Sequence, residues 1–245
     1  MTKQNAEQGL TPNTADYVAS VAKAALGAVP FAGSLLAEIV GTIVPNQRID
    51  RIVLFAQELE KRLSGIEQGL VRSQLSNENF TDLIEESLRQ AARSVSDERR
   101  AYIAALISNS ISTQNISYIE SKHLLRILGE LNDIEIIRLG AHLYETHGSG
   151  EEYRRTHSEI LEPVSAQLGS SQQEVDKETF QKSYDTHLVQ LGLLGVRFSV
   201  DSRTKQPELD SRTGAQKVRG YELTPLGRFL LRQVGIAAKP QSSRA

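Results

Sequence analysis

The feature that most constrains the fold of this chain is an ordered series of short segments near its C-terminus. An apolar helix end at 188–194 runs into a short predicted strand at 196–200. About twenty polar and charged residues follow, and then a second predicted strand at 220–223. Thr224 and Pro225 supply an N-cap and a first-turn proline, which together favour the start of another helix. The pattern predicts a small domain in which an antiparallel hairpin lies between two helices.

This order of helix, hairpin and helix resembles the back half of a winged-helix domain. The resemblance implies that the segment 170–194 is the recognition helix and that the hairpin is the wing. It also implies a surface that binds DNA or a protein partner. The candidate contact residues are Gln172, Gln173, Gln181, Lys182, Arg203, Lys205, Arg212, Lys217 and Arg219.

The charge pattern leaves DNA and protein open as partners. Residues 197–245 contain ten basic and four acidic side chains, an excess that attracts polyanions. The recognition helix expected from the resemblance has the opposite balance, with four acidic residues against Lys177 and Lys182. A major-groove reader usually presents Arg, Lys, Asn or Gln. Contact with a protein therefore suits this charge pattern about as well as contact with DNA.

The most unusual N-terminal segment is the apolar run at 18–45, in which Glu38 is the one charged residue between Ala24 and Val44. Pro30 is expected to break it into two short helices, at 15–28 and 32–44. The residues that define this apolar hairpin are Gly27, Pro30, Phe31, Gly33 and Gly41. The run is expected to be the core of a helical bundle. The alternatives are a hairpin that associates with a membrane surface and the interface of a homo-oligomer.

The remaining segments predict helices. An apolar stripe from Ile49 to Leu70 predicts one long helix, and further helices are expected to begin at Asn77 or Asn79, at Ser96, near Ile116, and at Asn132 with Glu135 as its capping-box partner. A loop is expected at 148–157, and helices at 158–169 and 170–194. The predicted fold class is mainly α: a helical bundle at 14–114, connecting helices at 115–147 and a winged helix at 155–235, between loose tails at 1–13 and 236–245.

Several kinds of chemistry find no support in the sequence. It has no cysteine, no glycine-rich nucleotide loop and no nucleophile elbow, and His142 and His147 are five residues apart, where a helical metal site needs three or four. We therefore expect no metal, no cofactor and no enzymatic activity. The lack of cysteine and of a signal-like start in the first ten residues leads us to expect a cytoplasmic protein.

Three stretches, VPFAGSLLAEI, RIDRIVLFAQELEKRL and YELTPLGRFLL, resemble a group of uncharacterised bacterial helical proteins. That resemblance implies no settled activity. The expected function is a non-catalytic regulator or adaptor that binds DNA or a protein through the winged helix. The alternative is a membrane-associating or pore-forming effector, of a toxin or phage-defence type, whose apolar hairpin inserts when triggered.

Overall fold

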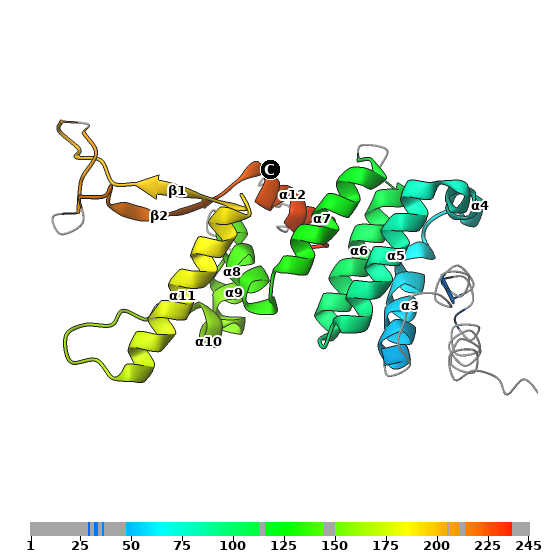
Figure 1. Ribbon diagram of the computed structural model, residues 1–245, viewed down its shortest axis with the longest axis horizontal. Coiled ribbons are helices and arrows are strands. Elements are labelled where there is room, and N and C mark those ends of the chain that lie inside the picture. Colours follow the sequence, from blue (N-terminus) through cyan, green and yellow to red (C-terminus); the bar gives the residue numbers. More distant parts are fainter. Residues whose placement is uncertain are drawn as a thin grey trace, which may run out of the picture. The chain divides into compact units, whose positions relative to one another are not determined.

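The computed structural model describes residues 29, 32–33, 36, 48–112, 116–144, 150–204, 206–210 and 214–236. The chain divides into two compact units, Met1–Leu125 and Arg126–Ala245, and the division falls inside helix α7 (Tyr118–Glu130). The described residues are mainly helical, with one two-stranded antiparallel sheet near the C-terminus (Figure 1). The prediction of a mainly α chain with a small β-hairpin is therefore confirmed.

The first unit is built on three helices that pack against one another, α3 (Ile49–Leu63), α5 (Glu78–Arg93) and α6 (Asp97–Ser112). The short helices α4 (Gln68–Ser73) and η2 (Gln74–Ser76) connect α3 to α5. Each of the three long helices turns apolar side chains inward. Their fully buried side chains include Ile52, Phe55, Leu59, Phe80, Leu83, Ile84, Leu88, Ile103 and Leu106.

Two predicted helix starts in this unit are confirmed by their capping bonds. The Asn77 side chain accepts hydrogen bonds from the backbone N–H groups of Asn79 and Phe80, at 3.0 and 3.4 Å. The Ser96 hydroxyl accepts one from the N–H of Arg99 at 3.2 Å. These side chains replace the hydrogen-bond partners that the first turn of a helix lacks.

The prediction of one helix from Ile49 to Leu70 is wrong, because α3 ends at Leu63. Ile66 N–H donates to the Leu63 carbonyl at 2.9 Å, and α4 begins two residues later. Gly65 lies in this break, and glycine is a weak helix former. Leu70 consequently leaves the apolar stripe and is 44% exposed.

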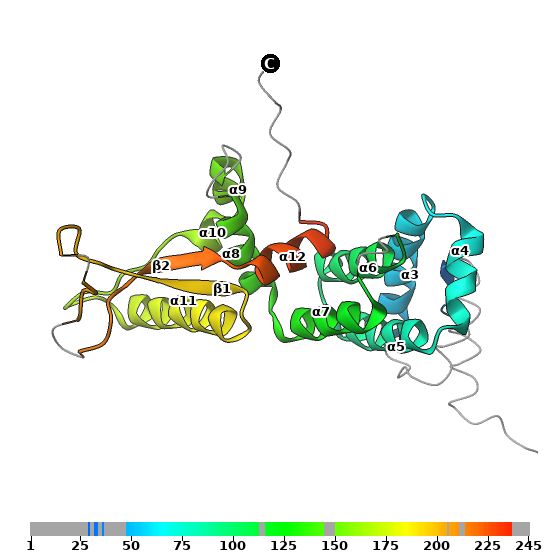
Figure 2. The same ribbon diagram turned by 90° about the horizontal axis from the view of Figure 1, so that it is seen from above.

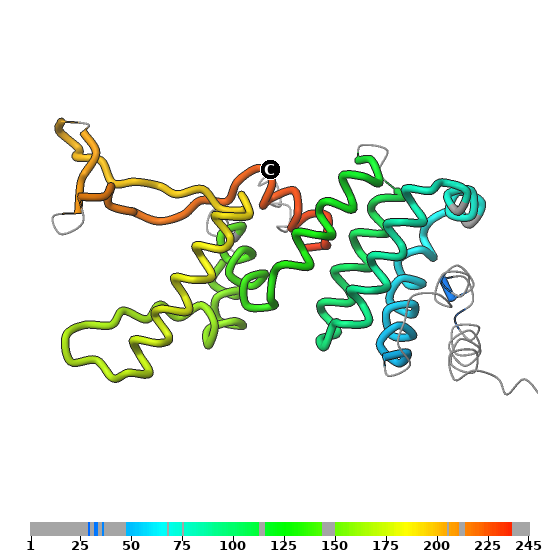
Figure 3. The backbone as a smooth tube through the Cα atoms, in the orientation of Figure 1, coloured from blue at the N-terminus to red at the C-terminus, as the bar shows by residue number. Residues whose placement is uncertain are grey.

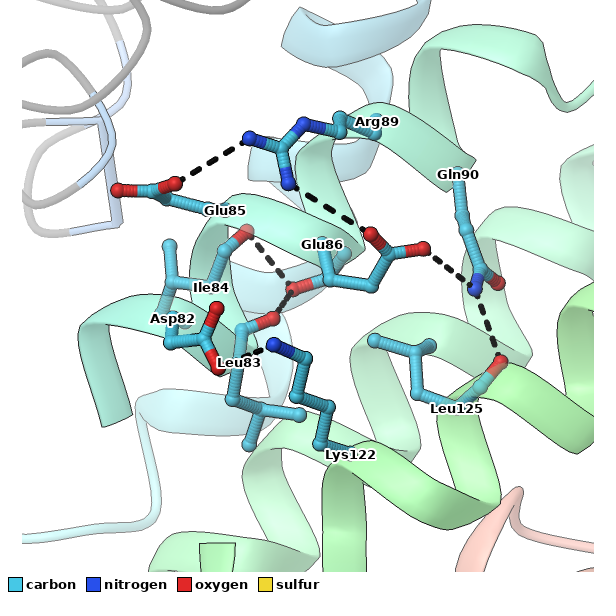
Figure 4. Close-up of polar contacts among 10 residues, drawn as sticks. Asp82, Leu83, Ile84, Glu85, Glu86, Arg89, Gln90, Lys122 and Leu125 are labelled. Atoms are coloured by element: carbon cyan, nitrogen blue, oxygen red, sulfur yellow. Dashed lines mark hydrogen bonds and ion pairs between the residues drawn. The ribbon is translucent and has the colours of Figure 1, made fainter. Parts of the chain in front are cut away.

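Helix α5 also makes polar contacts with the first part of α7 (Figure 4). Lys122 pairs with Asp82, and Gln90 Nε2 donates to the Leu125 carbonyl at 2.9 Å. The Phe80 ring packs against the Tyr118 ring with centroids 5.2 Å apart. Both the apolar and the polar sides of α5 are thus used within the first unit.

The part of the apolar run that the structure describes is buried. Val29, Ala32 and Leu36 are no more than 4% exposed, and Gly33 is also buried. Ala32 N–H donates to Glu60 Oε2 at 2.5 Å, which ties this segment to α3. Gly27, Pro30, Phe31 and Gly41 lie outside the described residues, as does most of both predicted helices. Among the described helices, none has the length and apolar character that crossing a membrane requires.

The second unit is organised around α8 (Asp133–Tyr144). The elements in contact with it are α9 (Gly150–Thr156), α10 (Ser158–Leu161), α11 (Gln172–Gln190), β2 (Val218–Leu223) and α12 (Pro225–Gln233). Strand β1 (Leu194–Phe198) pairs with β2. The core includes Ile136, Leu139, Leu143, Leu188, Leu193, Leu194, Leu230, Leu231 and Val234.

Two predicted caps in this unit are confirmed. Asn132 N–H donates to Glu135 and Glu135 N–H donates to Asn132, at 2.8 and 2.9 Å, which completes the capping box of α8. The Thr224 hydroxyl accepts a hydrogen bond from Gly227 N–H at 3.0 Å, and Pro225 occupies the first turn of α12. Both helices therefore start where the sequence predicts.

Two predictions for the segment between α8 and α11 are wrong. The expected loop at 148–157 contains α9, whose first turn holds acidic side chains and whose last turn holds basic ones, an order that suits the helix dipole. The expected helix at 158–169 is only the four-residue α10. Glu162, which precedes Pro163, is extended with a ψ of 119°. A proline disfavours helical backbone at the residue before it, so Pro163 ends the helix.

Candidate partner-binding surface

Helix α11 has well-defined ends that fix where it meets the hairpin. At its start, Ser171 and Glu174 form a capping box, in which Ser171 N–H donates to Glu174 Oε2 at 2.8 Å. At its end, Gly192 N–H donates to the Val189 carbonyl at 2.9 Å. Gly192 has a φ of 71°, which L side chains rarely adopt. This glycine turn sends the chain directly from α11 into β1.

The hairpin begins with a regular antiparallel ladder. Leu194 pairs with Leu223, Val196 with Tyr221 and Phe198 with Val218. A bulge beside Arg197 places the extra residue, Arg219, on β2. The alternation of side chains along each strand places the residues of these three pairs on one face of the hairpin.

Beyond the two strands, the hairpin tip divides into two small turns (Figure 3). One is closed by the bridge between Val200 and Pro207, and the other by the bridge between Leu209 and Gln216. Glu208 joins the two turns, since its N–H donates to the Ser199 carbonyl and its carbonyl accepts from Lys217 N–H, at 3.0 and 2.9 Å. The segment expected to be a polar wing therefore includes a folded tip that two isolated bridges close.

Asp201 holds the first of these turns together. Its carboxylate accepts hydrogen bonds from the N–H groups of Thr204 and Arg203, at 2.6 and 2.9 Å. These bonds, led by that from Thr204, lower the pKa of Asp201 below its ordinary value. The Asp201 carboxylate therefore accepts hydrogen bonds within its own turn, and these bonds stabilise its negative charge.

One face of the hairpin is apolar from its base to its tip, but only the base is covered. Leu194 at the base is 2% exposed, whereas Phe198 and Val218 are 46% and 49% exposed. Alternation through the bridges of the tip places Val200 and Leu209 on the same side as Phe198 and Val218, and they are 52% and 62% exposed. We call these four residues, Phe198, Val200, Leu209 and Val218, the distal apolar face.

The other face of the hairpin carries charges of both signs. Arg197 and Lys217 are exposed there, and Glu208 is the hydrogen-bonded neighbour of Lys217 across the tip. Glu222 pairs with Gly195 on the same face near the base. Neighbouring charges of opposite sign weaken the field that this face presents to a polyanion.

Helix α11 is also largely exposed. All 19 of its residues are described, and only Leu188 is buried. Phe180 is 61% exposed and stacks on Tyr184 with ring centroids 6.4 Å apart. Val175 on α11 is partly exposed, and Leu168, just before the helix, is fully exposed. In Figure 2, α11 and the hairpin extend in the same direction, and Figure 1 shows the two elements diverging from their common base.

Polar side chains fasten α11 to α8. Asp185 accepts hydrogen bonds from both Nε and Nη2 of Arg138, with distances of 2.8 to 3.0 Å, and both side chains are largely buried. His187 Nδ1 lies 2.7 Å from Glu135 Oε1, and the Glu135 side chain is also buried. These two contacts, which α11 makes from Asp185 and His187 just before the buried Leu188, fix how α11 is rotated against α8.

A shallow cavity of about 230 Å³ lies beside the Arg138–Asp185 pair, against Pro163 and Val164. Its charged side chains are already compensated, since Lys182 also pairs with Glu178 at 2.8 Å. The cavity belongs to the polar attachment of α11.

Tyr221 on β2 interacts electrostatically with the same charged side chains. Its pKa is raised above the ordinary value by burial and further by the negative charge of Asp185. The phenol therefore stays protonated, and it offers no nucleophile or base at neutral pH.

The contact residues suggested by the winged-helix resemblance differ in whether their side chains are already bonded within the unit. Gln181 clamps the preceding segment, since its side chain accepts from Val164 N–H and donates to the Glu162 carbonyl, at 3.1 and 2.8 Å. Gln172 donates to Asp176 at 2.8 Å, and Lys182 is paired with Glu178. Gln172 and Lys182 are nevertheless exposed, as are Gln173 on α11 and Arg203, Lys217 and Arg219 on the hairpin. Lys205 and Arg212 lie outside the described residues.

The distal apolar face was missed from the sequence, although a signal for it exists. The alternation of Val196, Phe198 and Val200 continues for one apolar residue beyond the end of β1. Alternation predicts that these apolar residues share one face of the strand, but it does not predict which of them are buried by other elements and which remain exposed.

The described residues contain no cluster of three or more histidine, aspartate or glutamate side chains that could hold a metal ion. No protein-family model, no curated protein and no solved structure matches this chain.

Proposed function

We propose that this chain is a non-catalytic adaptor or regulator whose second unit binds a protein partner through the distal apolar face of the hairpin. In this proposal the unit is a winged helix, with α11 at the place of the recognition helix and the hairpin as an elongated wing. The order of α11, β1, β2 and α12 along the chain supports that assignment. The lack of cysteine fits the reducing cytoplasm, where we place the protein.

The observation that carries the proposal is the exposure of four apolar side chains on one face of one element. Single exposed apolar residues are common on protein surfaces, but contiguous apolar patches mark interaction sites. Phe198 and Val218 pair directly across the strands, and Val200 and Leu209 extend the same face onto the tip. About half of the surface of these side chains is still exposed, and a partner that covers it gains the free energy of burying it.

The charges favour a protein over DNA as this partner. A DNA-binding wing needs cations that face the phosphates together, whereas Lys217 has Glu208 as its neighbour on the polar face. Of the side chains on α11 suited to reading bases, Gln181 and Gln172 are already engaged in bonds within the unit. An apolar face contributes nothing to phosphate contact. Since the hairpin as a whole is rich in basic residues, we infer that the partner presents an apolar surface with acidic residues around it.

Parallel anisotropy titrations test this function. The purified chain is titrated with a labelled acidic amphipathic helical peptide and with a labelled random-sequence duplex DNA, at several salt concentrations. We expect the peptide to bind, and the duplex to bind at least about ten times more weakly, because the apolar face that the peptide covers contributes nothing to phosphate contact. Phe198→Ser combined with Val218→Ser should abolish peptide binding, because it removes the apolar contact.

The matched control is Arg197→Ala combined with Lys217→Ala, on the opposite face of the same hairpin, which should retain peptide binding within about threefold. The proposal is wrong if the duplex binds tightly, with an affinity that falls linearly in log–log salt, and only the cation variant loses binding. That result would make the hairpin a DNA-binding wing. Circular dichroism of each variant checks that the fold is retained.

A further inference from the structure

Two exposed segments of the second unit have complementary chemistry. Residues 197–219, which form the distal hairpin, contain six basic and three acidic side chains. Residues 157–182, which lead into and form the first half of α11, contain two basic and five acidic side chains. Each segment also exposes large apolar residues: the distal apolar face on the hairpin, and Leu168, Val175 and Phe180 on the other. The second segment therefore has the surface that the hairpin requires of its partner.

These two segments do not cover each other within one chain. The hairpin contacts α11 through β1, near the glycine turn at Gly192, and the two elements diverge beyond it (Figure 1). Phe198 and Phe180 accordingly remain 46% and 61% exposed. The short turn between α11 and β1 holds the two segments apart, because hydrogen bonds from Gly192 and Leu193 tie it to the last turn of the helix.

We propose that the partner is a second copy of this chain, and that the distal hairpin of each copy packs on the first half of α11 of the other. This inference rests on the proposed function, because it names what covers the same apolar face. A two-fold axis forms each contact twice, since both halves of the contact are present on every copy. Cations on the rim of one hairpin then face acidic residues of the other copy's helix, and Phe180 with Tyr184 supplies an aromatic anchor.

The test uses two charge-reversal variants of the full chain that complement each other. The first combines Arg203→Glu with Arg219→Glu on the hairpin, and the second combines Glu159→Lys with Asp176→Lys before and on α11. All four side chains are exposed. None takes part in the contacts that fasten α11 to α8. Mass is measured by size-exclusion chromatography with light scattering over a wide range of concentration.

We expect the unaltered chain to be a dimer. The dimer of each variant alone should have a dissociation constant at least about ten times that of the unaltered dimer, because like charges then face each other. An equimolar mixture of the two variants should regain the dimer, because both of its contacts again join opposite charges. A monomeric unaltered chain, or a mixture that stays monomeric, would overturn the inference.

A second measurement separates this inference from the proposed function. If the unaltered chain is monomeric but the acidic peptide binds and Phe198→Ser with Val218→Ser abolishes that binding, the function stands and the partner is another protein. If the chain dimerises and the apolar double variant leaves the dimer intact, the contact lies elsewhere and this inference fails. A dimer that is lost in the apolar double variant and restored by mixing the charge variants supports both.

Discussion

Helices α5 and α11 are of similar length, yet they are held in place by different forces. Seven of the sixteen residues of α5 are buried, including Phe80, Leu83 and Leu88. Of the nineteen residues of α11, one is buried, and the helix is fixed instead by the Arg138–Asp185 and Glu135–His187 contacts. A helix fastened by a few polar contacts keeps most of its surface available. Helix α5 thus uses its apolar side chains in the core of the first unit, whereas α11 leaves Val175 and Phe180 exposed.

The largest expected effect comes from the same substitution made on both helices. Phe80→Ala removes a fully buried ring that packs on Tyr118, and it should lower the free energy of unfolding by about 3 to 5 kcal/mol. Phe180→Ala removes a ring that is 61% exposed, so the change should stay below about 0.5 kcal/mol. Chemical denaturation of both variants measures the difference, and equal losses would show that the two helices are held alike.

Breaking the polar attachment of α11 should have the next largest effect. Arg138→Met leaves the Asp185 carboxylate without its cation in a site where its side chain is 14% exposed, at a cost of about 3 kcal/mol. A double-mutant cycle with Asp185→Asn measures the coupling between the two side chains, and coupling near zero would show that this pair does not fasten α11.

Arg89→Met on α5 is the control for this change. Arg89 contacts the carboxylates of Glu85 and Glu86 at 3.3 and 3.6 Å, but its side chain is 43% exposed. Exposed ion pairs contribute little because water screens them, so this variant should cost less than about 1 kcal/mol.

A smaller effect is expected where α12 meets the base of the hairpin. A Cβ atom at Gly227 would lie 2.3 Å from the backbone oxygen of Leu193, so Gly227→Ala must shift one backbone against the other. We expect a loss of about 1 to 3 kcal/mol, seen as a lower melting temperature. Gly69→Ala in α4 is the control, because its Cβ would meet nothing closer than 3.7 Å and alanine favours helix. If both variants melt alike, α12 does not pack as closely as the structure indicates.

The smallest effect concerns two capping boxes with almost the same geometry. Ser171 N–H donates to Glu174 at 2.8 Å at the start of α11, and Ser117 N–H donates to Glu120 at 2.8 Å at the start of α7. These backbone bonds are the main cause that lowers the pKa of both glutamates below the ordinary value. A lowered pKa stabilises the folded state above the pKa of the unfolded chain, and this stabilisation is lost as the pH falls through the folded-state pKa.

Acidification from about pH 7 to about pH 3 should therefore weaken both caps, with different consequences. The start of α7 is attached to the core through Tyr118, whereas the residues around Glu174 are exposed. Glu120→Gln should reduce the acid dependence of the melting temperature, and Glu174→Gln should change only the amide exchange of the first turn of α11. An equal effect of both variants on the melting temperature would mean that the first turn of α11 is as firmly attached as that of α7.

Local rules predicted where most helices begin, because a capping side chain acts within three residues of itself. Asn77, Ser96, Asn132 and Thr224 all cap the helices that the sequence assigned to them. A local rule also accounts for the end of α10, because Pro163 disfavours helical backbone at Glu162 and the helix stops after four residues.

The candidate surface could be predicted only in part, because it depends on contacts between distant residues. Arg138 and Asp185 are 47 positions apart, and Glu135 and His187 are 52 apart, so no local spacing indicates that these pairs hold α11 by its polar side chains. With α11 attached in this way, Phe180 remains exposed, and the Gln181 side chain is hydrogen-bonded to the segment before the helix. Residue type alone therefore indicates neither that Gln181 is engaged within the unit nor that Phe180 is exposed.

Hydroxyl-radical footprinting of the full chain, over a range of concentrations and with the acidic peptide added, tests the central claim most directly. Phe80 should be unreactive throughout, because its side chain is fully buried in the first unit. Phe198 should react at low concentration and become protected when the second copy or the peptide covers the hairpin. A Phe198 that is unreactive at every concentration, or that stays reactive in the bound state, would contradict the account.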